Sequence, residues 1–82
     1  MKVDAYELEL RLAAMQRALV AHDALNRRLS QVDVPSTELP DKLMDGITLA
    51  ERLALISNQE AKCLKWINQE ANKAKHGGAL PF

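Results

Sequence analysis

Three polar side chains that could do chemistry interrupt two otherwise apolar helical patterns. They are His22 and Asn26 in the first half of the chain and Glu60 in the second half. A carboxylate beside an imidazole favours the charged form of both groups, and burial makes the pairing more consequential. If the two patterns face each other, the sequence predicts a polar layer of these three side chains within an apolar interface.

Such a layer has two main interpretations. Its structural role would be to fix helix register and oligomeric state, as a buried asparagine does in coiled coils, and this is the role that we expect. Its functional role would be a pH-sensitive or partner-gripping cluster, and a third possibility is a layer at the water-exposed edge. Cys63 lies about one turn beyond Glu60, but one His, one Glu and one Cys lack the dense spacing of a metal site. We therefore expect no metal and no cofactor.

No residue pattern indicates catalysis. The sequence has no glycine-rich phosphate loop, no serine in a nucleophile elbow and no His-Glu zinc motif. Most of the arginines fall outside the apolar patterns, whereas a catalytic helical bundle would need several cationic side chains that point inward. We expect a protein that is not an enzyme.

Two stretches carry the 4–3 apolar spacing that is typical of packed helices. The first contains Leu8, Leu12, Met15, Leu19, His22, Asn26 and Leu29. The second contains Leu49, Leu53, Ile56, Glu60, Leu64, Ile67, Ala71 and Ala74. Antiparallel pairing of the two stretches places His22 across from Glu60. The sequence therefore predicts an all-α fold, an antiparallel hairpin of two long helices.

The start of the chain and its middle contain clear boundary signals. Acidic residues in the first turns and basic residues near the end predict a first helix over about 4–31. Prolines and a glycine predict a connection over 32–47. Within it, Pro40 suits a first helical position and Gly46 a left-handed stop, which predicts a short helical turn over about 40–45.

The second long helix has a capping signal of its own. Thr48 and Glu51 fit the capping box, in which hydroxyl and carboxylate each accept from a backbone N–H of the first turn. This predicts a helix over about 49–75. We interpret residues 1–76 as one domain and 77–82 as a C-terminal tail.

The size of the chain points to self-association. A chain of 82 residues buries only about 60% of its unfolded surface, and one cysteine cannot form a disulfide within the chain. Oligomerisation is then the remaining way to enlarge the core. The first helix has a second stripe of small apolar residues that would let another helix approach closely. We expect a homodimeric four-helix bundle, or a groove that receives a helix of another protein.

The interface should include the only tryptophan, because Trp66 lies off the main pattern and tryptophan is enriched in interface hot spots. The alternative is that the connection covers Trp66 with Leu39 and Leu43. In the tail, Leu80 and Phe82 would expose apolar surface unless they dock. The residues expected at a protein interface are Trp66, Leu55, Leu10, Ala14, Ala21, Leu80 and Phe82.

The overall charge and hydropathy do not favour nucleic acid or a membrane as the partner. Eleven basic residues balance eleven acidic ones, so no overall field draws the chain to nucleic acid or to an anionic membrane. The N-terminus lacks the apolar region of a secretory signal, and no apolar run approaches the roughly 20 residues of a membrane span. We expect a cytoplasmic protein.

These observations together predict a small regulatory or adaptor protein that acts by protein binding. An inhibitor or assembly factor of bacterial or phage type would fit this description. The alternative is a nucleic-acid-binding regulator that uses the basic helix ends of a dimer.

Overall fold

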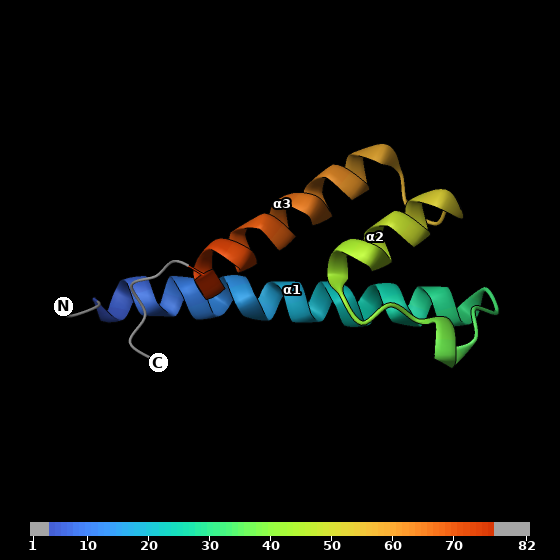
Figure 1. Cartoon of the computed structure of the whole chain (residues 1–82). Helices are drawn as coiled ribbons and strands as arrows, with labels where there is room; N and C mark the ends of the chain where they lie inside the picture. Colours follow the sequence, from blue (N-terminus) through green and yellow to red (C-terminus); the bar gives the residue numbers. More distant parts are fainter. Residues whose placement is uncertain (1–3, 77–82) are drawn as a thin grey trace.

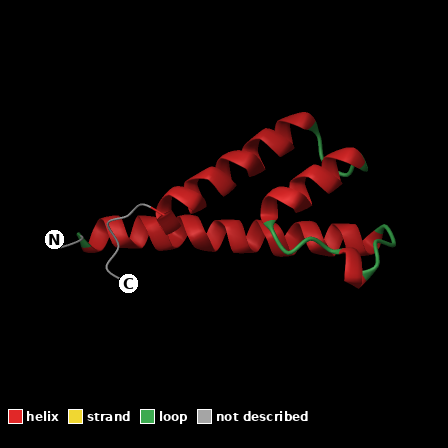
Figure 2. Cartoon of the chain, viewed as in Figure 1, coloured by secondary structure: helices red, strands yellow, loops and turns green. Residues whose placement is uncertain are grey.

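The computed structural model describes residues 4–76, and this part of the chain contains helices joined by loops and no strand (Figure 2). There are three α-helices, α1 (Ala5–Gln31), α2 (Leu43–Arg52) and α3 (Asn58–His76). A short 3₁₀ helix, η1 (Ser36–Glu38), lies in the connection between α1 and α2. The all-α class is confirmed.

The first helix, predicted over about 4–31 from the charged residues near its ends, spans Ala5–Gln31. Asp4 precedes α1, and its side chain accepts a hydrogen bond from the backbone N–H of Tyr6 at 3.2 Å. At the other end, the N–H of Val32 turns back onto the carbonyl of Leu29 at 3.2 Å. Asp33 then adopts a left-handed φ of 65°, which aspartate tolerates better than most residues. These local signals end α1 and start the connection.

The second helix differs from the prediction. Gly46 does not stop a helix; it lies buried within α2. Thr48 does not cap a helix either, because its hydroxyl donates to the carbonyl of Met44 at 3.0 Å, one turn back in α2. Leu43, Ile47 and Ala50 are buried on one face of this helix. Burial of this face outweighs the roughly 1 kcal/mol by which glycine disfavours a helix interior.

The third helix starts nine residues later than predicted, with a capping box of its own. The backbone N–H of Ser57 donates to Glu60, and the backbone N–H of Glu60 donates to the Ser57 hydroxyl, each at 3.1 Å. Ala54, at a left-handed φ of 58°, lies in the turn between α2 and α3. The predicted helix over 49–75 is therefore wrong, because the chain forms two helices there.

The three helices form an open wedge (Figure 1). α3 returns along α1 in the opposite direction, and its C-terminal end lies against the N-terminal half of α1. α2 packs against both at the other end, where α1 and α3 diverge. The radius of gyration is 14.6 Å, whereas a compact domain of this length would have about 12 Å. The two-helix hairpin of the prediction is replaced by this elongated three-helix arrangement.

The core lies at the wide end of the wedge. Its buried residues are Leu25, Leu29, Leu43, Ile47, Ala50, Ile56 and Ala61. At the narrow end, the buried contacts are small, with Ala14 on α1 and Ala74 on α3. Alanines allow the two helix backbones to approach closely but cover little surface. The first four turns of α1 therefore have little cover.

The apolar pattern of α1 faces only partly inward. Leu25 and Leu29 are buried, but Leu12 and Leu19 are 49% and 69% exposed. The predicted packing of these two leucines against the last helix is wrong, because α1 instead packs through Ala14, Ala18 and Leu25. None of the helices in residues 4–76 combines the length and apolar character needed to cross a bilayer.

Candidate functional site

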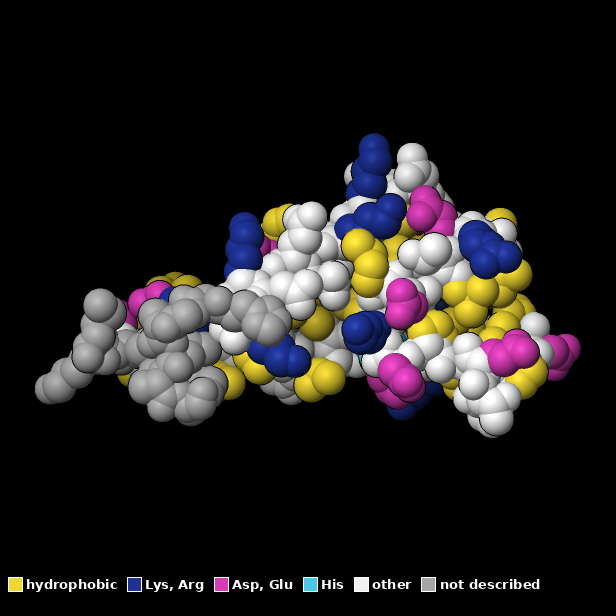
Figure 3. All heavy atoms as spheres, viewed as in Figure 1, with side chains coloured by type: hydrophobic (Ala, Val, Ile, Leu, Met, Phe, Trp, Pro, Cys, Tyr) yellow, Lys and Arg dark blue, Asp and Glu magenta, His cyan; other side chains and the backbone are white. Residues whose placement is uncertain are grey.

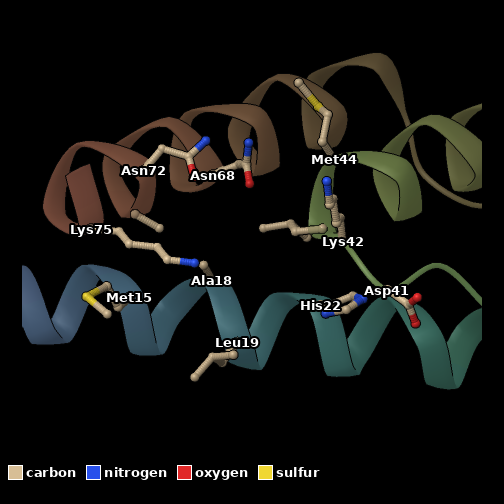
Figure 4. A pocket seen from close by; sticks show the side chains of 12 residues that line it. Met15, Ala18, Leu19, His22, Asp41, Lys42, Met44, Asn68, Asn72 and Lys75 are labelled. Carbon is tan, nitrogen blue, oxygen red and sulfur yellow. The ribbon is translucent and has the colours of Figure 1, made fainter.

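An open cleft of about 540 Å³ lies between α1, α3 and the start of α2 (Figure 4). Its lining residues are Met15, Ala18, Leu19, His22, Asp41, Lys42, Leu43, Met44, Asn68, Ala71, Asn72 and Lys75. Apolar side chains come mainly from α1 and α2, whereas α3 contributes amides and an ammonium group that extends toward Ala18. Such a lining suits an amphipathic segment, with an apolar side and a polar side.

His22 ties the connection to α1 at one end of this cleft. Its Nε2 lies 2.8 Å from the carbonyl oxygen of Pro40. A carbonyl only accepts hydrogen bonds, so this nitrogen carries the hydrogen. Asn26 Nδ2 lies 3.3 Å from the same histidine nitrogen. Because that nitrogen carries a hydrogen, it cannot accept a hydrogen bond from Asn26. The amide group of Asn26 instead donates to the Pro40 carbonyl over a long distance of 3.5 Å. The two polar residues of α1 thus hold the loop that leads into α2.

Glu60 does not join this pair. Its carboxylate instead caps α3 and lies 3.7 Å from Nη1 of Arg28. Arg28 also donates to the carbonyl of Leu55 in the turn before α3. The predicted layer of three residues is therefore wrong in its third member. The physical reason is the turn between α2 and α3, which breaks the continuous helix on which the predicted register depended.

The environment of Glu60 favours its charged form. The hydrogen bond from the backbone N–H of Ser57 holds the pKa of Glu60 below its ordinary value of 4.5, and the Ser57 side chain and Arg28 act in the same direction. Partial desolvation opposes the shift. The carboxylate is exposed to solvent. It caps the first turn of α3 and, through Arg28, links α3 to α1.

Trp66 lies on the outer face of α3 and is 54% exposed. The alternative that the connection covers it is wrong, since Leu39 and Leu43 pack in the core beside α2 instead. Leu55, which shares the predicted flank, is half-buried and also packs against the core. The structure therefore separates these two expected interface residues.

The remaining expected interface residues have different positions. Leu10 is exposed, Ala14 is buried against α3, and Ala21 is half-buried against the core. Leu80 and Phe82 lie outside the described residues. Of these three residues of α1, only Leu10 is exposed to another protein.

The sequence indicated a second apolar stripe on α1 and Leu10 as an interface residue, but it did not predict that Leu12 and Leu19 are exposed or that Tyr6 and Val20 lie on an accessible flank. The cleft flank is the side of α1 that carries Leu19, which lines the cleft, and Leu12. The groove flank is the side that carries Leu10 and Val20, which line hollows on another side of α1, and Tyr6. All five side chains are exposed. Successive residues of a helix differ by about 100° in direction, so Leu19 and Val20 point to different sides of α1. Two apolar stripes on one helix are more than a single neighbouring helix can cover, and this pattern is the reason why the sequence predicted a second interface on α1.

Several surface charges of residues 4–76 are paired with a neighbour of opposite sign. Ion pairs join Arg11 to Glu7, Arg27 to Asp23, Lys65 to Glu51 and Lys73 to Glu70, at distances from 2.8 to 3.6 Å. Figure 3 shows both signs of charge interspersed over one face of the molecule. Within residues 4–76, no group of three or more His, Cys, Asp or Glu side chains is arranged to hold a metal ion.

Comparisons with known proteins add no relative: no family model matches the chain, and no curated protein or solved structure matches it significantly.

Proposed function

We propose that this chain is a small, non-catalytic regulatory or adaptor protein that binds other protein chains through the apolar flanks of α1. The observation that carries the proposal is the exposure of five large apolar side chains on one helix. Single exposed apolar residues are normal, whereas several exposed apolar residues on the same side of a helix favour an interaction surface. An inhibitor or an assembly factor would use such surfaces.

The burial along α1 supports this proposal. The helix has 27 residues, but only Ala14, Leu25 and Leu29 are buried. Full burial of an exposed leucine or valine stabilises a complex by about 1.5–3 kcal/mol. Contact with a partner would therefore give α1 the stabilisation that its own chain does not supply.

The cleft flank fits an amphipathic helix of a different protein. Leu19 lies at the cleft beside Met15, and Lys42 and Lys75 line the same cavity. A helix with an apolar stripe and acidic residues beside it would match both the leucine and the lysines. This partner chemistry agrees with a regulatory role that depends on binding alone.

Self-association is part of the same proposal. A homodimer that buries a flank of α1 from each copy would enlarge a core in which only Leu29 and Ile47 are fully buried large side chains. The α1 and α3 helices of the two copies would then form a four-helix bundle.

Nucleic-acid binding, the alternative, is less favoured because several of the basic residues that it would use are already paired. Arg27, Arg28 and Lys73 each lie within ion-pair distance of a carboxylate of the same chain. A nucleic-acid complex would lose affinity steeply with added salt, whereas an apolar interface would change little.

Site-specific photo-crosslinking in extracts of the source cell tests the proposal. A photoreactive amino acid replaces Leu19 in one variant, and Gln69, exposed on α3, in a matched control. We expect a discrete protein adduct at position 19 that persists at high salt and is absent at position 69. Equal labelling at both positions, or adducts with nucleic acid only, would contradict the proposal.

A further inference from the structure

A groove runs between α1 and α3 on the side away from the cleft. It consists of three adjoining hollows of about 370, 510 and 260 Å³. The first two share Arg17, and the last two share Ala21 and Ala24. The groove therefore extends along α1 from Glu7 to Arg28, a length of about 31 Å at 1.5 Å per residue.

The lining of the groove suits close packing of a helix. On α1 it contains Leu10, Ala13, Val20 and Ala24, and on α3 it contains Ile67. Small residues between larger ones let a helix of similar length approach both walls. Leu10 and Val20 remain exposed on this surface, so residues 4–76 do not fill the groove.

We propose that a second copy of this chain fills the groove, with the two α1 helices antiparallel about a two-fold axis between Ala13 and Arg17. The inference rests on the proposed function, because it assigns one of the two α1 flanks to self-association. It leaves the cleft flank on the opposite side of α1 available for a different protein.

The groove flank of one copy can pack against the same flank of a second copy, because large and small side chains alternate along it. This favours a second copy over another partner. In an antiparallel pair centred between positions 13 and 17, Tyr6 lies opposite the partner subunit's Ala24. Leu10 then lies opposite the partner subunit's Val20, so that each large side chain meets a smaller one. A two-fold interface needs this kind of self-complementarity, because the same patch forms both halves.

The proposed two-fold register also brings unlike charges of the two copies close together. Glu9 and Arg17 form no ion pair within residues 4–76. In the proposed register, Arg17 lies opposite the partner subunit's Ala13 and one helical turn from the partner subunit's Glu9. The two-fold axis repeats this charge pair, so the interface contains it twice.

Two neighbouring residues provide a matched test. Val20 lies on the groove flank and is 62% exposed, whereas Leu19 lies on the cleft flank and is 69% exposed. Sedimentation equilibrium of Val20→Glu and Leu19→Glu compares the two flanks with nearly the same change. We expect Val20→Glu to weaken dimerisation by about a hundredfold or more, because it buries an unpaired carboxylate twice per dimer. We expect Leu19→Glu to leave the dimer unchanged.

Pulsed electron spin resonance then tests the register, with single spin labels introduced at Gln16 or Gln31 in a Cys63→Ser background. Both glutamines are exposed on α1. In the antiparallel register, labels at Gln16 lie close together, whereas labels at Gln31 lie about 48 Å apart along the helix axis. A parallel pair would give short distances at both positions.

Each outcome bears on the inference. A dimer that survives Val20→Glu but dissociates with Leu19→Glu would overturn it, as would short distances at Gln31. An unmodified chain that remains a monomer would also overturn it, and this result would leave the proposed binding of a different protein intact. If Val20→Glu does not fold, Arg17→Glu takes its place, and restoration of the dimer by adding Glu9→Arg would support the proposed charge pair.

Discussion

At the scale of single residues, Gly46 distinguishes the structure most sharply from the prediction made from sequence. A left-handed glycine at a helix end resists replacement, whereas a glycine inside a helix lowers stability relative to alanine. A Cβ atom at Gly46 would meet only Cδ1 of Leu25, at an ordinary contact distance of 3.8 Å.

We therefore expect Gly46→Ala to stabilise the protein by about 0.5–1 kcal/mol. Chemical unfolding followed by circular dichroism measures this change. A loss of stability would indicate that residue 46 stops a helix, as its sequence context first indicated.

Ser57 is the residue on which the start of α3 depends. Its hydroxyl accepts the backbone N–H of Glu60 at 3.1 Å. We expect Ser57→Ala to lower the free energy of unfolding by about 1 kcal/mol, because the first turn loses its cap. Ser30→Ala, an exposed substitution near the end of α1, is the matched control and should change stability by less than about 0.5 kcal/mol. Equal effects of the two substitutions would show that Ser57 is not an important cap.

The charge of Glu60 makes stability depend on pH. Because the folded state lowers the pKa of this carboxyl, its contribution is present above the unfolded value and is lost as the pH falls through the folded value. Glu60→Gln should therefore lower the melting temperature near neutral pH, and the difference from the unmodified protein should vanish in strong acid. A difference that does not change with pH would contradict this account.

At the scale of elements, His22 positions α2 through the connection. Its hydrogen bond to the Pro40 carbonyl joins α1 to the residues just before α2. His22→Phe keeps a ring of similar shape but removes the donor, and we expect it to cost about 1 kcal/mol. Hydrogen exchange should become faster in α2 and unchanged in the N-terminal turns of α1. Unchanged exchange in α2 would show that packing alone holds this helix.

The elements also show how far local sequence signals reach. Acidic residues in the first turns of α1 and basic residues near its end are visible in the local sequence. The boundaries of this helix could therefore be predicted. The second half of the chain contains two matches to the same capping pattern, at Thr48 and at Ser57. The choice between them depends on burial of Ile47 against the other helices, which is a tertiary effect and is invisible to a local pattern.

The error in the candidate site has the same origin. The predicted meeting of His22 and Glu60 assumed one unbroken helix from residue 49 onward. A turn after Arg52 changes the direction of the residues that follow, so Glu60 meets Arg28 instead. His22 and Asn26, which lie one turn apart within one helix, could be grouped correctly from their spacing alone.

At the scale of the whole molecule, the core and the exposed apolar flanks of α1 lie at different ends. The buried leucines and isoleucines gather where α2 separates α1 from α3, while the exposed flanks occupy the N-terminal part of α1. Surface of this kind is stabilised by association, because burial of apolar area favours the complex. The central claim is that the groove flank of α1 is covered by a second copy in solution.

Carbene footprinting of the unmodified chain at low and high concentration tests this claim most directly. The reagent labels exposed side chains without regard to their chemistry, and the modified positions are identified by mass spectrometry. Association should protect Leu10 and Val20, while Trp66, on the outer face of α3, remains labelled at both concentrations. Unchanged labelling of Leu10 and Val20, or protection confined to Trp66, would contradict the account.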